Sequence, residues 1–274
     1  SILFAFVAAA THFIIALITA DNSADEVHEV MGLPGISIPQ GFAVTEYPIF
    51  KALDKIYDMV SPKSKDSFND EKTIEKVSNN KLLNILKDPV YLGLIIGLAL
   101  SFSVGYNVKS ALTVGMAMAA LMFLLPRMVK VLMEGLLPIS NAAKEFMSKK
   151  YEGAEFLIGM DSAILLGHPT TLAVGLLLIP ITLVLAMILP GNTTLPLGDL
   201  ASTAYFVSMA SVIHHGKFGR TLISGTVMMA IVLLIASFFA PQLTLFAQSG
   251  AVSIPEGAAS ITALSAGNLY AFIL

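Results

Sequence analysis

The sequence predicts an all-α membrane protein: a polytopic helical bundle with re-entrant hairpins and an amphipathic cytoplasmic helix region. Two observations predict this class. Hydrophobic residues make up 55% of the 274 residues and charged residues only 13%, which is more apolar surface than a water-soluble fold could cover. The apolar residues also gather in long runs, as expected where lipid is the outer solvent and each helix satisfies its own backbone.

The first part of the chain, residues 1–60, is predicted to hold a span, a re-entrant loop and an interfacial helix. Residues 2–20 form an apolar run long enough to cross a hydrocarbon core of roughly 30 Å. Gly and Pro recur in residues 31–41, which predicts an irregular loop. Residues 42–60 are apolar at helical spacing with charges between, which is typical of a helix at the membrane interface. Residues 61–88 are hydrophilic and predicted to form a cytoplasmic loop.

The remaining residues, 89–274, are predicted to form the membrane bundle with the substrate-site hairpins, within one transporter domain. Residues 90–106 and 110–126 read as a tight hairpin of spans, followed by a basic, amphipathic stretch. Further apolar runs cover residues 164–189, 203–213, 222–240 and 261–274. The run 203–213 is too short to cross by itself. Both ends of the sequence lie inside apolar runs, so we expect a part of a longer chain.

Orientation follows from the positive charges. Lys and Arg crowd residues 51–87 and residues 127–150, whereas the hairpin tip between them carries only Lys109. Positive charge is retained on the cytoplasmic side, so both crowded regions are predicted to be cytoplasmic. Two spans separate them, which returns the chain to the same side.

Composition and motifs exclude several functions. The formal net charge is −3 and no basic stripe with aromatics occurs, so nucleic acid is not an expected partner. Cys is absent, which removes disulfides, thiolate nucleophiles and cysteine metal sites from these residues. No Walker, nucleophile-elbow or zinc-protease motif is present. We therefore expect neither a free-standing hydrolase nor an ATP-driven pump, and we predict no metal site and no cofactor.

Three Gly/Pro-rich segments with polar groups lie at the edges of apolar runs: residues 35–48, 153–169 and 190–199. Irregular backbone at membrane depth needs protein or a water-filled cavity to satisfy its N–H and C=O groups. The segments therefore predict re-entrant hairpins around a cavity. Ordinary connecting loops near the surface are the alternative.

Ionisable groups are embedded in the second of these segments. Glu155, Asp161 and His168 stand in otherwise apolar sequence, where such groups usually face a bundle interior or an aqueous pathway. Asp161 and His168 are seven residues apart, which would place them near one face if the stretch were helical. The alternative is a structural pair that only stabilises packing.

The other two segments supply groups suited to hydroxyls. Asn192, Thr193, Thr194 and Asp199 offer donors and acceptors that fit a polyol better than an ion. Gln40 and Glu46 add an amide and a carboxylate. The alternative is that these residues serve as turn and helix caps, beside Gly191 and Gly198 in the case of Asn192 and Asp199. His214 and His215, next to Gly216, are predicted to lie in a solvated interfacial turn.

Several strings carry a resemblance to a known family. They are GISIPQG at residues 35–41, EFLIGMD at 155–161, LGH at 166–168, PGN at 190–192, LGDL at 197–200 and RTLISG at 220–225. In this order and spacing the chain resembles the galactitol-type enzyme IIC, the membrane permease of the bacterial sugar phosphotransferase system. The resemblance runs from about residue 29 to about residue 240.

The resemblance implies a bacterial inner-membrane, multi-pass permease that takes up a hexitol such as galactitol while it is phosphorylated. In the family the phosphoryl group passes from IIA to a cysteine of IIB and then to the substrate in IIC. The absence of Cys is consistent with that, because the donor thiol belongs to the partner. The implied partners are the polyol, phosphorylated IIB with IIA upstream, membrane lipid and a second copy of the chain in a homodimer.

The resemblance leads to a hypothesis for the site. Asp161 or His168 orients or deprotonates the attacking hydroxyl, with Asp161 the first choice. The other hydroxyls are held by Gln40, Glu46, Glu155, Asn192 and Asp199. Family members often have His at the position of Gln40, but an amide still binds hydroxyls. Without the resemblance, an ion- or proton-coupled secondary transporter of a small polar solute would be preferred, since it uses the same broken helices.

Overall fold

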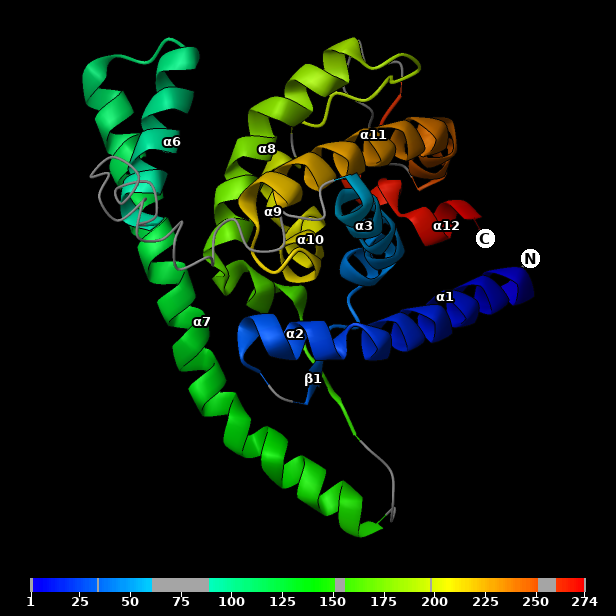
Figure 1. Cartoon of the computed structure of the whole chain (residues 1–274). Helices are drawn as coiled ribbons and strands as arrows, with labels where there is room; N and C mark the ends of the chain where they lie inside the picture. The colour runs from blue at the N-terminus through cyan, green and yellow to red at the C-terminus, as the bar shows by residue number, and fades with distance from the viewer. Residues whose placement is uncertain are drawn as a thin grey trace.

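The structure is a computed structural model that describes residues 2–33, 35–60, 89–150, 156–197, 199–250 and 260–273. Within these ranges it is almost entirely helical (Figure 1). In the part of the chain that the structure describes, four helices are long and apolar enough to cross a membrane: α1 (Ile2–Asn22), α7 (Val108–Lys150), α8 (Pro169–Ile188) and α11 (Phe218–Ser249). The predicted class, a membrane helical protein, is confirmed.

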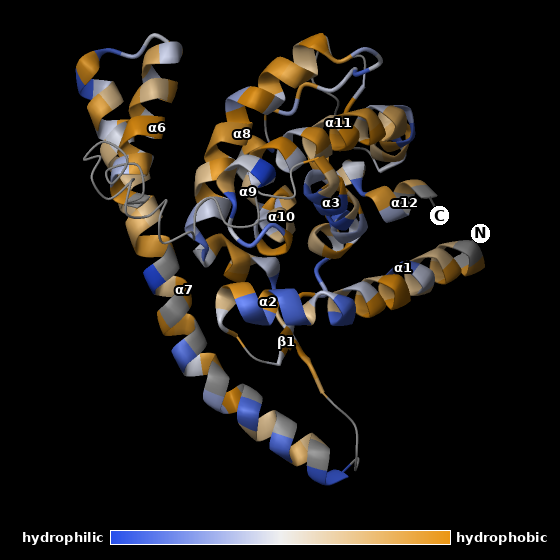
Figure 2. Ribbon diagram, in the orientation of Figure 1, coloured by the Kyte–Doolittle hydropathy of each residue, from blue (hydrophilic) through white to orange (hydrophobic). Residues whose placement is uncertain are grey.

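The predicted hairpin is present as α6 (Pro89–Ser103) and the first part of α7, although α6, with 15 residues, is shorter than the helices that could cross. Small residues let the two helices approach closely, because a Cβ added at Gly97 would lie 2.8 Å from the Cα of Gly115. The helix α7 then continues without interruption through the basic stretch. In Figures 1 and 2 this half of α7 extends away from the bundle and alternates polar and apolar residues.

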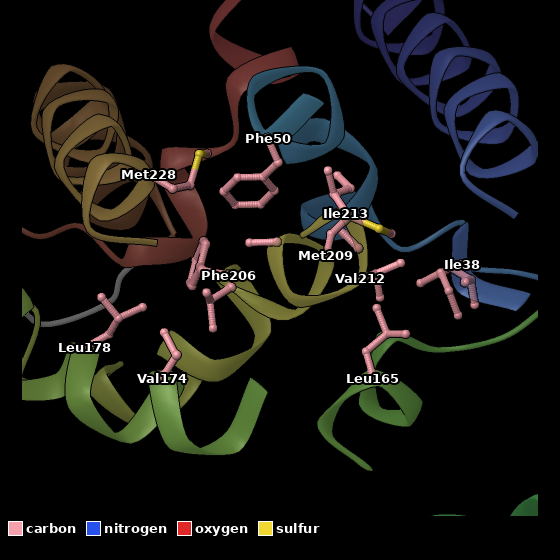
Figure 3. Close-up of a cluster of buried hydrophobic side chains, with 14 of the residues drawn as sticks. Ile38, Phe50, Leu165, Val174, Leu178, Phe206, Met209, Val212, Ile213 and Met228 are labelled. Atoms are coloured by element: carbon pink, nitrogen blue, oxygen red, sulfur yellow. The ribbon is translucent and has the colours of Figure 1, made fainter. Parts of the chain in front are cut away.

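The centre of the bundle is the short helix α10 (Ser208–Ile213), in which all six residues are buried. It packs against α2 (Ala24–Met31), α3 (Gly41–Val60), α8, α9 (Thr203–Phe206) and α11. Figure 3 shows Met209, Val212 and Ile213 of α10 among Phe50 of α3, Phe206 of α9 and Leu165. The sequence predicted one apolar run at residues 203–213, and the structure divides it at Val207 into α9 and α10.

Two parts of the structure differ from the predictions. The first half of α3 is buried rather than interfacial, since Ala43, Val44, Glu46 and Phe50 have no exposed surface. The run 261–274 forms only a 3₁₀-helix, η4 (Leu264–Gly267), and the short α12 (Leu269–Ile273), because Gly267 and Asn268 interrupt it. The predicted cytoplasmic loop, residues 61–88, lies outside the described residues.

A two-stranded parallel ladder joins two of the Gly/Pro-rich segments, which an all-α prediction did not include. Strand β1 (Ile36–Ser37) pairs with β2 (Ile158–Gly159). The amide of Ile158 donates to Gly35 O at 3.0 Å, and the amide of Met160 donates to Ser37 O at 2.9 Å. The ladder satisfies backbone groups of these irregular segments. Re-entrant hairpins at membrane depth stay a prediction.

Candidate functional site

The ladder brings Gln40 and Asp161 to the same region, because each follows one of the paired strands. Gln40 is the cap of α3: its Oε1 accepts from the amides of Phe42 and Ala43, both at 3.0 Å. Asp161 caps the 3₁₀-helix η2 (Ser162–Gly167), with Oδ1 accepting from the Ala163 amide at 2.7 Å. The Asp161 side chain is exposed. In each side chain, one oxygen accepts the hydrogen bonds that cap a helix. The other polar atom, Nε2 of Gln40 or Oδ2 of Asp161, has no hydrogen-bond partner among the described residues.

His168 stands at the opposite end of η2 and caps α8. Its Nδ1 accepts from the Thr170 amide at 3.2 Å. Its ring packs on Gly216, where an added Cβ would lie 2.9 Å from His168 Cε1. Burial lowers the pKa of the His168 imidazole, which favours the neutral ring. Asp161 and His168 therefore cap the two ends of a 3₁₀-helix and do not form the predicted pair on one helix face.

Glu46 is the most unusual polar group in the bundle. It has 0% exposure, and neither carboxylate oxygen has a hydrogen-bond partner within the described residues. Phe42 and Phe50, one turn to either side on α3, contact the rings of Phe206 at 4.7 Å and His214 at 6.5 Å between centroids. Helix α3 is not one of the spanning helices, and burial raises the Glu46 pKa well above its ordinary value. An unpaired buried carboxyl is costly, so a polar ligand would stabilise it.

Asn192 and Asp199 make contacts that the turn and cap alternative anticipated. Asn192 Nδ2 donates to the carbonyls of Ala186 and Thr194, both at 2.8 Å, and its Oδ1 accepts from Ser237 Oγ at 2.8 Å and from the Thr194 amide at 3.3 Å. Asp199 Oδ2 accepts from the Leu264 amide at 2.8 Å. These bonds tie the connection after α8 to α11 and η4. Glu155 lies outside the described residues.

A buried network beside α3 was missed by the sequence analysis. His214 is 1% exposed, so its prediction as part of a solvated turn is wrong, whereas its neighbour His215 is exposed. His214 Nδ1 lies 2.8 Å from Asp54 Oδ1, and its Nε2 lies 2.8 Å from Ser224 Oγ. The Tyr57 hydroxyl completes the chain at 3.1 Å from Ser224 Oγ.

Arg220 binds two carboxylates next to this network. Its Nη1 donates to Asp54 and to Asp58, both at 3.0 Å. Burial raises the pKa of Asp54, but the hydrogen bonds from His214 and Arg220 and the charge of Arg220 outweigh it and hold that pKa below its ordinary value. One signal was available in the sequence: Glu46, Phe50, Asp54 and Asp58 recur every four residues and so share one face of α3.

The chain is similar to membrane permeases of one known family. Residues 1–257 match the family described as "PTS system sugar-specific permease component" (EIIC-GAT). A protein of Escherichia coli K12 named "Putative permease IIC component" is 44% identical over 270 residues, covering 98% of this chain and 60% of that protein. The galactitol-specific EIIC components of E. coli K12 and O157:H7 are 37% identical over 217 residues, covering 79% of this chain and 47% of each relative.

The chain therefore spans about half to three fifths of the length of these curated relatives. No solved structure matches it.

Proposed function

The chain belongs to the sugar-specific permease family of the phosphotransferase system, EIIC-GAT, and from that premise we propose that the full protein binds a galactitol-like polyol and translocates it while phospho-IIB phosphorylates it. It is a multi-pass protein of the bacterial inner membrane. The similarity to galactitol-specific components supports a hexitol as substrate. The phosphoryl group comes from IIB, with IIA upstream, and the protein acts as a homodimer.

The observation in the structure that carries the proposal is the orphaned carboxyl of Glu46. A buried carboxyl with Phe42 and Phe50 one turn away on the same helix can hold a neutral hydroxylated solute by hydrogen bonds, while aromatic rings cover its C–H surface. Glu46 follows the family string at residues 35–41 by five positions on the helix that the string begins. We assign Glu46 to a substrate hydroxyl, and Gln40 to another through its amide nitrogen.

The reaction needs little covalent work from the permease. A substrate hydroxyl oxygen attacks phosphorus, the O–P bond forms, the S–P bond to the IIB cysteine breaks, and the hydroxyl proton moves to a base. Positioning and charge stabilisation supply most of the acceleration in such transfers.

The geometry favours Asp161 over His168 as that base. Because His168 Nδ1 accepts from the Thr170 amide, the neutral ring carries its proton on Nε2, which is then a donor and not a proton acceptor. Asp161 is exposed and keeps one oxygen beyond its cap bond. We therefore propose Asp161 as the base and His168 as a donor to the substrate or to a phosphoryl oxygen.

The remaining predicted ligands carry unequal weight. Asn192 already uses both amide hydrogens and two acceptor positions, so we assign it to holding its turn. Asp199 keeps one oxygen free of the Leu264 bond and stays in the proposed set. Glu155 stays in the set on its position in the sequence. The basic stretch of α7 and residues 51–87 are proposed to dock IIB, with a purely topological role as the alternative.

The test is phosphoenolpyruvate-dependent phosphorylation of labelled galactitol by membranes containing the full-length protein, with the soluble carriers and IIB supplied. Product that requires both IIB and this protein is the expected result. If no galactitol is phosphorylated but labelled galactitol accumulates with an ion gradient, the protein is a secondary transporter and the proposal is wrong.

The same assay tests the base. We expect Asp161→Asn to lower the rate by roughly 100-fold or more, the usual contribution of general base catalysis. Asp25→Asn is the matched control, because Asp25 is an exposed acid on α2, outside the proposed site and the proposed IIB dock. Near-normal phosphorylation and uptake by Asp161→Asn would overturn the assignment.

A further inference from the structure

We propose that His214 is a positioning residue: its bonds to Asp54 and Ser224 hold α3, which carries Gln40 and Glu46, against the α10–α11 turn on which His168 packs. The inference rests on the proposed function and adds a residue to that reaction. It comes from the contacts of a buried ring that joins α3 to α11 and that no proposed role has used.

The hydrogen bonds fix the direction of the network. An ionised carboxylate can only accept, so His214 Nδ1 donates to Asp54. In the neutral ring Nε2 then accepts from the Ser224 hydroxyl, and Ser224 Oγ accepts from the Tyr57 hydroxyl. Each nitrogen of the ring therefore has a partner on a different helix, Asp54 on α3 and Ser224 on α11. Arg220 reinforces the same join by binding Asp54 and Asp58 from α11.

On one side the ring sets the position of α3. Phe50 lies on the same face of α3, between Asp54 and Glu46, and its ring meets the His214 ring edge to face at 6.5 Å between centroids. Figure 3 shows Phe50 pointing into the cluster formed with Phe206 and Met228. Glu46 lies two turns before Asp54 on α3, with Pro48 between them, so a shift of α3 relative to His214 is expected to move the Glu46 carboxyl as well.

On the other side the ring sets the turn against which His168 rests. His214 is the C-cap of α10, and Gly216, two residues later, bonds back through its amide to Ser211 O at 2.8 Å. The Thr170 hydroxyl donates to Gly216 O at 3.0 Å, next to the contact between Gly216 and the His168 ring. The positive φ of Gly216, 71°, favours glycine at this close approach.

His214 therefore bonds to α3, the helix that carries Gln40 and Glu46, and caps the turn whose Gly216 packs on the His168 ring. If the join loosens, the substrate is still bound, but its hydroxyl is held less well for attack on phosphorus. A misplacement of about 1 Å costs roughly 100-fold in rate in comparable cases. The expected signature is a loss of kcat with little change in KM for galactitol.

The experiment uses the full-length protein and phospho-IIB. Ser224→Ala and His214→Ala are expected to lower kcat by roughly 10- to 100-fold and to change KM by less than about threefold. His214→Asn is expected to recover much of the rate, because its amide nitrogen can take the place of Nδ1 as the donor to Asp54. Thr226→Val is the control, since it removes an α11 hydroxyl whose described bond stays within its own helix, to Leu222 O.

The distance between α3 and α11 is measured separately. Spin labels are attached to the cysteines of a variant that carries Lys55→Cys and Gly219→Cys and has no other cysteine. Lys55 is exposed, and a Cβ at Gly219 meets no atom within 4 Å. His214→Ala is expected to broaden the distance distribution between α3 and α11, and Thr226→Val to leave it unchanged. If His214→Ala does not fold, Ser224→Ala and Tyr57→Phe, which each remove one oxygen, are compared in its place.

The outcomes separate the two proposals. A wild-type protein that does not phosphorylate galactitol overturns the proposed function, and the distance distribution then decides whether the join exists. If wild-type protein is active, unchanged kcat in both Ser224→Ala and His214→Ala overturns the positioning role. A rise in KM with kcat preserved also overturns it, because His214 would then act on binding alone.

Discussion

Two polar regions of this bundle differ in how far their hydrogen bonds are satisfied within the described residues. Around Asn192, two amide hydrogens and the carbonyl oxygen are bonded to α8, to the turn and to Ser237 of α11. On α3, the carboxyl of Glu46 is more deeply buried than Asn192 and has no partner among the described residues. The first pattern is that of a group that holds the fold, and the second is that of a group awaiting a ligand. The hydrogen-bond partners of a polar residue therefore distinguish a structural role from a functional one, whereas its residue type does not.

Among Glu46, Asn192 and Gln40, the largest loss of activity is expected when Glu46 is replaced. Glu46→Leu should lower galactitol phosphorylation by about 100-fold, because it removes the hydrogen bonds proposed for one substrate hydroxyl. It should leave the free energy of unfolding unchanged or raise it by about 1–3 kcal/mol, because an unpaired buried carboxyl is removed. Denaturant titration in detergent, together with the phosphorylation assay, measures both. A large loss of stability would show that Glu46 holds the fold and would remove the contrast with Asn192.

The opposite pattern is expected at Asn192. Asn192→Ala should lower the free energy of unfolding by about 2 kcal/mol, since it removes the side-chain bonds that join the turn to Ala186 and Ser237. The KM of the remaining folded protein for galactitol should stay within a factor of about two. Thr193→Ala is the matched control, because the described bond of Thr193 uses its backbone amide and survives the change. A raised KM at full stability would place Asn192 among the substrate ligands.

The smallest changes in stability and activity are expected when Gln40 is replaced. Its oxygen is bonded within the fold, as in Asn192, whereas its amide nitrogen has no partner among the described residues, as in Glu46. Gln40→Ala should cost about 1 kcal/mol of stability through loss of the cap on α3. Gln40→Glu keeps an oxygen for the cap and removes the amide hydrogens, so it should retain stability and raise the KM for galactitol several-fold. Thermal unfolding and initial rates of the two variants separate the roles. Equal KM values in Gln40→Glu and wild type would show that Gln40 caps α3 and does not bind the substrate.

Much of the fold could be predicted from the sequence because hydrophobic run length depends on the membrane and not on neighbours. The spans at α1, α8 and α11 and the hairpin of α6 with α7 follow from that rule. The ladder could not be predicted, because strands of two residues have no periodicity of their own. Its pairing depends on contacts between segments far apart in the sequence.

The candidate site could be predicted less well than the fold. The sequence identifies Glu46 as a polar residue in an apolar context, but only the packing shows that it has no partner. His214 was assigned to a solvated turn because Gly216 and Lys217 follow it, and packing of α3 against α10 buries it instead. For Asn192 and Asp199, adjacent glycines had already indicated turns and caps, and Gly191 has the expected positive φ of 82°.

The ladder between Ile36 and Ile158 also bears on how the protein is made. About 120 residues of chain separate the two strands, so at 5–20 residues per second the first strand is synthesised on the order of ten seconds before its partner. During that interval its backbone amides and carbonyls are unpaired at the start of α3. At the membrane depth predicted for this segment, lipid cannot satisfy them, so water or the insertion machinery would have to cover it until β2 emerges. A ribosome that stalls before residue 158 would therefore leave an unfinished permease with this segment open to quality-control proteases.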